Sequence, residues 1–241
     1  MNPAAVVVHG AGRMAAAIAA AAADREDVTV TALVAPGQPE WKSGLPCFQS
    51  LDELETTPDF LIDFTLPEGT LTAAKWCAKG GVPMVSGVTG LPEAVVDALE
   101  TASESVPVLW SPNLSIGVNL LADLAGRAGA VLDDGVAVAI EDIHHQWQKD
   151  APSGTALMLG ERVAEGRGLG DSGIRYSSVR EGEVIGEHTV RFSLQGEEFE
   201  LVHRALDRSI YARGAIAAGQ WLMKQPPGLY QARDWLEGSC R

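Results

Sequence analysis

The feature that most constrains the fold is a regular alternation of short apolar, β-branched runs with helix-forming stretches in the first half of the chain. Five runs are predicted as strands: residues 4–8, 28–34, 60–64, 83–86 and 106–110. Three helices are predicted among them: residues 14–23, 68–79 and 92–104. Alternation of this kind predicts an α/β fold with a parallel, doubly wound sheet.

A glycine-rich turn follows the first predicted strand directly. The segment Gly10-Ala11-Gly12-Arg13-Met14-Ala15 fits the pattern G-x-G-x-x-A, in which the glycines allow a tight turn and the close approach of a pyrophosphate. A structural turn without a cofactor is the plain alternative. The second strand ends in Leu33-Val34-Ala35-Pro36, with no acid for ribose hydroxyls and no arginine for a 2′-phosphate. The choice between NAD and NADP therefore stays open.

The second half of the chain groups its predicted strands instead of alternating them. A helix at 116–131, a strand at 136–143 and a helix at 153–165 come first. Three strand-like runs and a helix then follow: residues 174–180, 187–194, 198–203 and 209–223. Strands without helices between them predict an antiparallel or mixed sheet. We therefore expect a second domain, and one face of its sheet would be free to pair with another subunit.

One segment combines residues suited to proton transfer and to anion binding: His144-His145-Gln146-Trp147-Gln148-Lys149-Asp150-Ala151-Pro152-Ser153-Gly154-Thr155. Ser153 is a good N-cap, and the first free N–H groups of the following helix favour a carboxylate or phosphate. An imidazole titrates near neutrality and an ammonium is cationic, so the segment could hold an anionic substrate and protonate it. A capped surface helix with a polar lead-in is an equally good interpretation of these residues alone.

Motifs along nearly the whole chain resemble those of the 4-hydroxy-tetrahydrodipicolinate reductase family, also called dihydrodipicolinate reductases, of the lysine and diaminopimelate pathway. Besides the glycine loop, the motifs are Ile62-Asp63-Phe64-Thr65-Leu66-Pro67-Glu68-Gly69-Thr70, Ser86-Gly87-Val88-Thr89-Gly90, Asn113-Leu114-Ser115-Ile116-Gly117-Val118-Asn119, Asp150-Ala151-Pro152-Ser153-Gly154-Thr155-Ala156, Gly186-Glu187-His188-Thr189, His203-Arg204-Ala205 and Gly228-Leu229-Tyr230.

This resemblance implies a Rossmann-type dinucleotide-binding domain at residues 1–113, rejoined by 212–241. It implies a central α+β domain at 114–211 that binds substrate and builds a homotetramer. The implied reaction is reduction of 4-hydroxy-tetrahydrodipicolinate, a small anionic cyclic dicarboxylate, to tetrahydrodipicolinate, with NADH or NADPH as the hydride donor.

The resemblance also implies roles for individual residues. His144 matches the proton donor of the family, and substrate carboxylate contacts match His145, Gly154 and Thr155. Cofactor contacts match three loops: Gly10, Ala11, Gly12, Arg13 and Met14; Gly87, Val88 and Thr89; and Ser111, Pro112, Asn113 and Leu114.

The chain departs from the family pattern at the catalytic lysine. That position, four residues after the first histidine, is Gln148, and Lys149 stands next to it as a candidate replacement. Glutamine donates hydrogen bonds but lacks the full positive charge that steadies a developing anion. Ala15 replaces a glycine, Val88 replaces a threonine, and the glycine loop is one residue short. Two alternatives therefore stay open: a reductase of a different cyclic imine, or a catalytically silent homologue.

Charge and cysteine usage limit the partners and the compartment. A net charge of −14 disfavours nucleic acids and anionic membranes as partners, so an anionic substrate needs a locally positive pocket. No apolar run reaches the length that spans a membrane. Cys47, Cys77 and Cys240 form no CxxC pair, which favours the reducing cytoplasm. We expect no metal, because the adjacent histidines lack the spacing and the additional ligands of a zinc site.

Overall fold

The computed structural model describes residues 2–133, 135–168 and 173–239. The chain forms two compact units. The first unit comprises Met1–Ser115 and Ser209–Arg241, and the second comprises Ile116–Arg208. The domain boundaries expected from the sequence, at 113/114 and 211/212, lie two or three residues from these unit boundaries.

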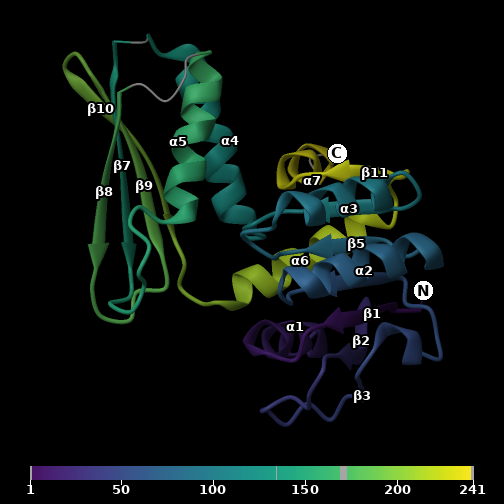
Figure 1. Cartoon of the computed structure of the whole chain (residues 1–241). Coiled ribbons are helices and arrows are strands. Elements are labelled where there is room, and N and C mark those ends of the chain that lie inside the picture. The colour runs from purple at the N-terminus through teal and green to yellow at the C-terminus, as the bar shows by residue number, and fades with distance from the viewer. Residues whose placement is uncertain (1, 134, 169–172, 240–241) are drawn as a thin grey trace. The chain divides into compact units, whose positions relative to one another are not determined.

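The first unit contains a seven-stranded sheet in the order β11-β6-β5-β4-β1-β2-β3 (Figure 1). Every pair of neighbouring strands is parallel. The strands are β1 (Ala4–His9), β2 (Val28–Val34), β3 (Cys47–Phe48), β4 (Phe60–Asp63), β5 (Met84–Ser86), β6 (Pro107–Trp110) and β11 (Gly228–Tyr230). The direction of winding reverses between β1 and β4, which is where such sheets bind nucleotides at the carboxyl ends of the strands.

Helices cover both faces of this sheet because its central strands are apolar on both sides. Val6 and Val8 pack into one core with α1 (Arg13–Ala23) and α6 (Ser209–Leu222). Val7 points into the other core, beneath α2 (Pro67–Gly80) and α3 (Glu93–Ser103). The 3₁₀ turn η1 (Leu51–Glu53) and the last helix, α7 (Ala232–Ser239), complete the unit. The period-2 alternation of the valines thus supplies both layers.

The second unit contains a four-stranded sheet in the order β10-β9-β7-β8. Its strands are β7 (Ala137–His144), β8 (Ile174–Arg180), β9 (Glu187–Leu194) and β10 (Glu197–Arg204). Only β7 and β8 run parallel, joined by α5 (Gly154–Arg167), so the sheet is mixed. Helix α4 (Ile116–Val131) lies beside α5 on one face of the sheet (Figure 1). Among the described residues of this unit, no helix or strand covers the other face.

The structure confirms the predicted fold class, an α/β unit with a doubly wound parallel sheet and an α+β unit with a mixed sheet. The predicted strands and helices are present with ends shifted by at most two residues. Four short elements were not predicted: β3, η1, β11 and α7.

Cys77 is buried and Cys47 is partly buried, whereas Cys240 lies outside the described residues.

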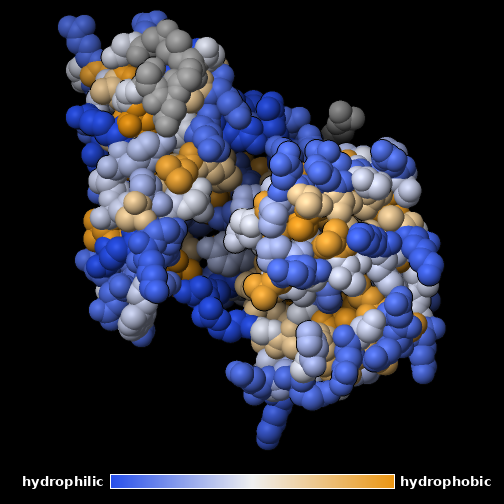
Figure 2. Space-filling model, viewed as in Figure 1, coloured by the Kyte–Doolittle hydropathy of each residue, from blue (hydrophilic) through white to orange (hydrophobic). Residues whose placement is uncertain are grey.

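Within the described ranges, no helix has both the length and the apolar character needed to cross a bilayer. Figure 2 shows hydrophilic residues spread over the visible face of each unit, with hydrophobic residues in small scattered groups.

Candidate active site

The glycine loop after β1 brings the backbone close to the neighbouring strand. Gly10 has a φ of +127°, a conformation that side chains rarely adopt, and its N–H donates to the Val34 carbonyl at 2.8 Å. A Cβ at position 10 would lie 3.2 Å from the carbonyl oxygen of Phe64, which follows β4. The turn therefore requires glycine, and it lies where β1 and β4 meet.

The start of α1 is suited to a negatively charged group. Gly12 is the N-cap and offers no side chain to the first helical N–H groups. The first turn contains no acidic residue, and Arg13 in that turn is exposed. Free N–H groups together with the positive end of a helix favour a phosphate, so this part of the loop fits the pyrophosphate of a dinucleotide.

Two further loops end at the same edge of the sheet. Gly87, after β5, packs so closely on Phe64 that a Cβ would lie 2.3 Å from its ring. Ser111, after β6, donates its N–H to the Ser86 carbonyl at 3.1 Å. The structure thus brings the loops after β1, β4, β5 and β6 together in one row.

Not every predicted cofactor residue presents a side chain in this row. Val88 and Leu114 are 6% and 2% exposed, so only their backbones could face a ligand. The Val88 carbonyl already accepts a hydrogen bond from Trp110 Nε1 at 2.9 Å. Thr89 and Pro112 are exposed. After β2, Ala35 is buried and Pro36 is exposed, which leaves no charged side chain at that position for a ribose.

A buried carboxylate holds these loops together from beneath. Asp63 ends β4 and is fully buried. Its Oδ2 accepts hydrogen bonds from Thr70 and Ser86, and its Oδ1 accepts from Thr65. His9 Nδ1 lies 3.3 Å from Oδ1 without hydrogen-bond alignment. Burial would raise the pKa of Asp63, but His9 and the hydroxyl donors outweigh burial and hold that pKa below its usual value.

In the second unit, His144 ends β7 with its imidazole on the face of the sheet that α5 covers. The residue is 7% exposed, and its Nδ1 lies 3.1 Å from Asp142 Oδ1. Burial lowers the pKa of His144, and the hydrogen bond that its Nδ1 donates to Asp142 opposes that effect. The imidazole is therefore held in one orientation and gives up a proton readily, as a proton donor requires.

Two more histidines continue from His144 across the sheet, one on each of the next two strands. The ring of His188, in β9, meets the His144 ring edge to face at 5.0 Å, and the ring of His203, in β10, is 6.5 Å from that of His188. Burial lowers the pKa of His188 to about 4, so this ring is neutral at physiological pH. The sequence favoured structural roles for both; their Nδ1 atoms are buried without a partner among the described residues.

The loop after β7 carries the position where the family lysine was expected. Gln148 is half-buried and donates to Asp150 at 3.3 Å, whereas Lys149 is exposed. His145 is half-buried, with its ring 5.8 Å from that of Trp147. The Lys149 side chain is thus free to extend from the loop next to His144 and His145.

Helix α5 begins as the sequence predicted. Ser153 caps it, because its hydroxyl accepts the N–H of Ala156 at 3.2 Å. A Cβ at Gly154 would meet no atom within 4 Å, so the helix start is open at that residue. The same start is tied to Asp142, whose Oδ2 accepts the N–H of Ser153 at 3.1 Å. The predicted proton donor and the predicted anion-binding turn therefore share one carboxylate.

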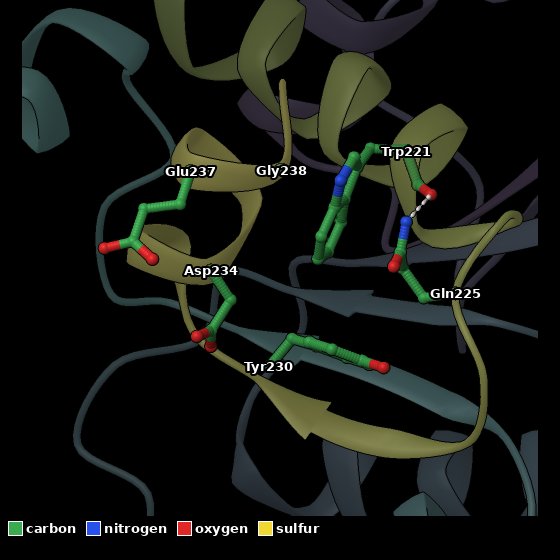
Figure 3. A pocket seen from close by; sticks show the side chains of 6 residues that line it. All are labelled: Trp221, Gln225, Tyr230, Asp234, Glu237 and Gly238. Atoms are coloured by element: carbon green, nitrogen blue, oxygen red, sulfur yellow. Dashed lines mark hydrogen bonds between the residues drawn. The ribbon is translucent and has the colours of Figure 1, made fainter. Parts of the chain in front are cut away.

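A pocket of about 410 Å³ lies elsewhere in the first unit. Its lining residues are Trp221, Gln225, Tyr230, Asp234, Glu237 and Gly238 (Figure 3). Strands β6, β5 and β4 separate β11, which carries Tyr230, from β1 and the glycine loop. Asp234 accepts the Gln231 N–H and Glu237 accepts from Arg233, so both carboxylates have partners within the chain. This pocket is not part of the loop row described above.

The described residues contain no cluster of three or more histidine, cysteine, aspartate or glutamate side chains arranged for a metal ion.

Comparisons with known proteins agree over nearly the whole chain. Models for the N-terminal and C-terminal parts of dihydrodipicolinate reductase match residues 4–114 and 117–236. The 4-hydroxy-tetrahydrodipicolinate reductase of Xanthomonas euvesicatoria is 43% identical over 234 residues, which cover 95% of this chain and 96% of that protein. The enzyme of that name from Stenotrophomonas maltophilia is 42% identical over 242 residues, covering 98% and 99%.

A solved structure shares the fold. The dipicolinate-bound dihydrodipicolinate reductase from Paenisporosarcina sp. TG-14 superposes with a TM-score of 0.83 at 24% identity and covers 95% of this chain and 97% of its own.

Proposed function

The chain belongs to the dihydrodipicolinate reductase family, and we propose that it reduces 4-hydroxy-tetrahydrodipicolinate to tetrahydrodipicolinate with NADH or NADPH, a step of lysine and diaminopimelate biosynthesis. The observation that carries this proposal is the joint placement of His144 and the start of α5 on the Asp142 carboxylate. A proton donor next to a helix start that attracts carboxylates suits the protonation of a small dicarboxylate.

On the cofactor side, the first unit supplies a glycine turn and an uncapped helix start. We assign the cofactor to Gly10, Ala11, Gly12, Arg13, Met14, Gly87, Val88, Thr89, Ser111, Pro112, Asn113 and Leu114, with Val88 and Leu114 contributing only backbone atoms. When bound, NADH or NADPH supplies the hydride. The chain itself cradles the pyrophosphate at Gly10 and Gly12 and keeps side chains out of the space beside Phe64.

On the substrate side, the N–H groups of Gly154 and Thr155, the Thr155 hydroxyl and His145 hold the carboxylates, and His144 gives the proton. Its Nδ1 is engaged by Asp142, so the proton leaves from Nε2. This division of roles explains why the imidazole is buried in a fixed orientation while the helix start remains open.

Oxidation of NADH and of NADPH in the presence of freshly generated substrate tests the proposed reaction. Rapid, substrate-dependent oxidation is expected with one or both cofactors. Cofactor binding without turnover of this substrate would overturn the proposal. Turnover of a different cyclic imine would then identify a reductase of altered specificity, and no turnover at all would identify a silent homologue.

We assign the positive charge of the missing lysine to Lys149. Changing Lys149 to alanine is expected to lower kcat/KM by about tenfold or more, mainly through KM, because a charge-assisted contact to a substrate carboxylate is lost. Steady-state kinetics at low salt measure the effect. Lys79→Ala, which removes the same charge from an exposed site on α2, serves as the matched control. An unchanged kcat/KM in Lys149→Ala would contradict the assignment.

We also propose that the second unit associates into a homotetramer through the open face of its sheet. Side chains of both charge signs lie on that face, among them Glu141, Arg191 and Glu200, and Arg191 pairs with Glu200 across β9 and β10. Val202, on the same face, is 41% exposed. Sedimentation should give about four times the mass of one chain, and Val202→Asp should lower the measured mass. A monomer in the wild type would exclude the proposal.

We also propose that the protein is located in the cytoplasm, which the free thiols of Cys47 and Cys77 support.

A further inference from the structure

Asp142 is a buried carboxylate to which several elements of the second unit converge. It lies two residues before His144 on β7, so both side chains point to the face that α5 covers, and its exposure is 0%. Its Oδ1 accepts from His144 Nδ1 at 3.1 Å and from Arg180 Nη1 at 2.7 Å. Its Oδ2 accepts from the Ser178 hydroxyl at 2.8 Å and from the Ser153 N–H at 3.1 Å. Four donors from β7, β8 and the start of α5 thus meet on one group.

These donors keep the carboxylate charged. Burial by itself would raise the pKa of Asp142, but hydrogen bonds from Arg180, Ser178 and Ser153 outweigh it and hold that pKa below its usual value. An ionised carboxylate can only accept hydrogen bonds. The Nδ1 of His144 therefore carries a hydrogen, and the remaining ring nitrogen, Nε2, is the atom that gains and loses the transferred proton.

Nε2 packs against a glycine, and charged or titratable groups from several elements surround the ring. Gly186 lies beside it, and a Cβ at that position would come within 3.1 Å of Nε2. The groups that act on His144 are Asp142 on its own strand, Arg180 on β8, His188 on β9 and Asp150 in the following loop. His188 is neutral, with its ring next to His203. Arg180 also donates to the Asp150 carbonyl, which fixes the loop that carries Lys149.

We propose that Asp142, held in its charged form by Arg180, is the positioning residue of this reductase: it sets the tautomer, the orientation and the proton affinity of His144 and fixes the start of the substrate-binding helix. This role rests on the proposed function of His144 as the proton donor. Asp142 is itself buried beneath the site and acts through His144 and Ser153.

Replacing Asp142 with asparagine tests the proposal, since it keeps the shape and removes the charge. The kcat at neutral pH is expected to fall by about 10–100-fold, because part of the general-acid contribution is lost. The substrate KM is expected to change less than about fivefold, because the Ser153 side chain still caps α5. The decline of kcat toward alkaline pH should begin at a lower pH, because the variant loses a negative charge that favours protonated His144.

Two further variants separate positioning from simple loss of structure. Ser177→Ala changes an exposed serine on β8 whose side chain points to the opposite face of the sheet, and its kcat–pH profile should match that of the wild type. Asp142→Glu restores the charge and should bring the profile back toward the wild-type position. A profile in Asp142→Asn that does not move, in a folded variant, overturns the proposal.

Measurement of the His144 ring nitrogens by ¹⁵N NMR, on the full chain without substrate, provides a readout that does not need turnover. The neutral ring is expected to carry its hydrogen on Nδ1 in the wild type, with a lower pKa for His144 in Asp142→Asn. Hydrogen on Nε2 instead would exclude the positioning role. An inactive wild type that shows the expected tautomer would count against the proposed function alone.

Discussion

Replacing His144 with glutamine is expected to lower kcat by about 10²–10⁴-fold while the substrate KM changes by only a few fold. The glutamine amide can still donate to Asp142, so the buried carboxylate keeps a partner and the fold is retained. What the variant lacks is an acid that titrates near neutrality. Steady-state kinetics across a range of pH measure the loss, and the variant should also lose the part of the pH profile that comes from the imidazole.

A second histidine of the same sheet provides the control. His203 lies on β10, and the ring of His188 separates its ring from that of His144. His203→Gln should leave kcat within about threefold of the wild type. Equal losses in both variants would mean that the histidine cluster matters for folding and not for proton transfer. A His144→Gln variant with wild-type kcat would exclude the proton-donor role.

Local patterns predicted most of the fold. The apolar runs of the first half are short, β-branched and bounded by turn residues, so their alternation with helices specified a parallel sheet before any tertiary contact was known. Elements of two or three residues, such as β3 and β11, contain too few side chains to show a period. Their strand conformation comes from pairing with β2 and β6, which are distant in the sequence. Helix α7 has only eight residues, which is shorter than the window over which helical periodicity is assessed in a sequence.

The site divides in the same way between local and distant determinants. His144 and the Ser153 cap were predictable because neighbouring residues define them. Asp142 could have been found from period-2 alternation, which places it on the same face as His144. Arg180 could not, because it reaches Asp142 through the parallel register of β7 and β8, in which His144 pairs with Arg180. That register depends on how α5, which connects the two strands in the chain, packs on the face of the sheet, and no local pattern encodes it.

Replacing Asp63 with alanine is expected to produce the largest loss of stability in the first unit, about 3–5 kcal/mol. The carboxylate is fully buried and joins β4, α2 and β5 through Thr70 and Ser86, with His9 of β1 beside it. Alanine leaves these polar groups without their acceptor and leaves a cavity in the sheet edge. Because Gly10 and Gly87 belong to loops at the same edge, the KM for the cofactor should rise as well.

Thermal unfolding followed by tryptophan fluorescence measures this loss, since Trp147 is the one tryptophan in the second unit and the other five lie in the first. The Tm should fall by roughly 10 °C. Asp97→Ala, which removes an exposed carboxylate from α3, should leave Tm almost unchanged. The folded-state pKa of Asp63 lies below that of the unfolded chain, so its stabilisation is complete above a pH of about 4 and is lost as the pH falls below that value. The difference in Tm between wild type and Asp63→Ala should therefore shrink in acid. Two results would show that other contacts hold together the loops at this edge of the sheet. One is a difference in Tm that stays constant with pH, and the other is a Tm of Asp63→Ala equal to that of Asp97→Ala.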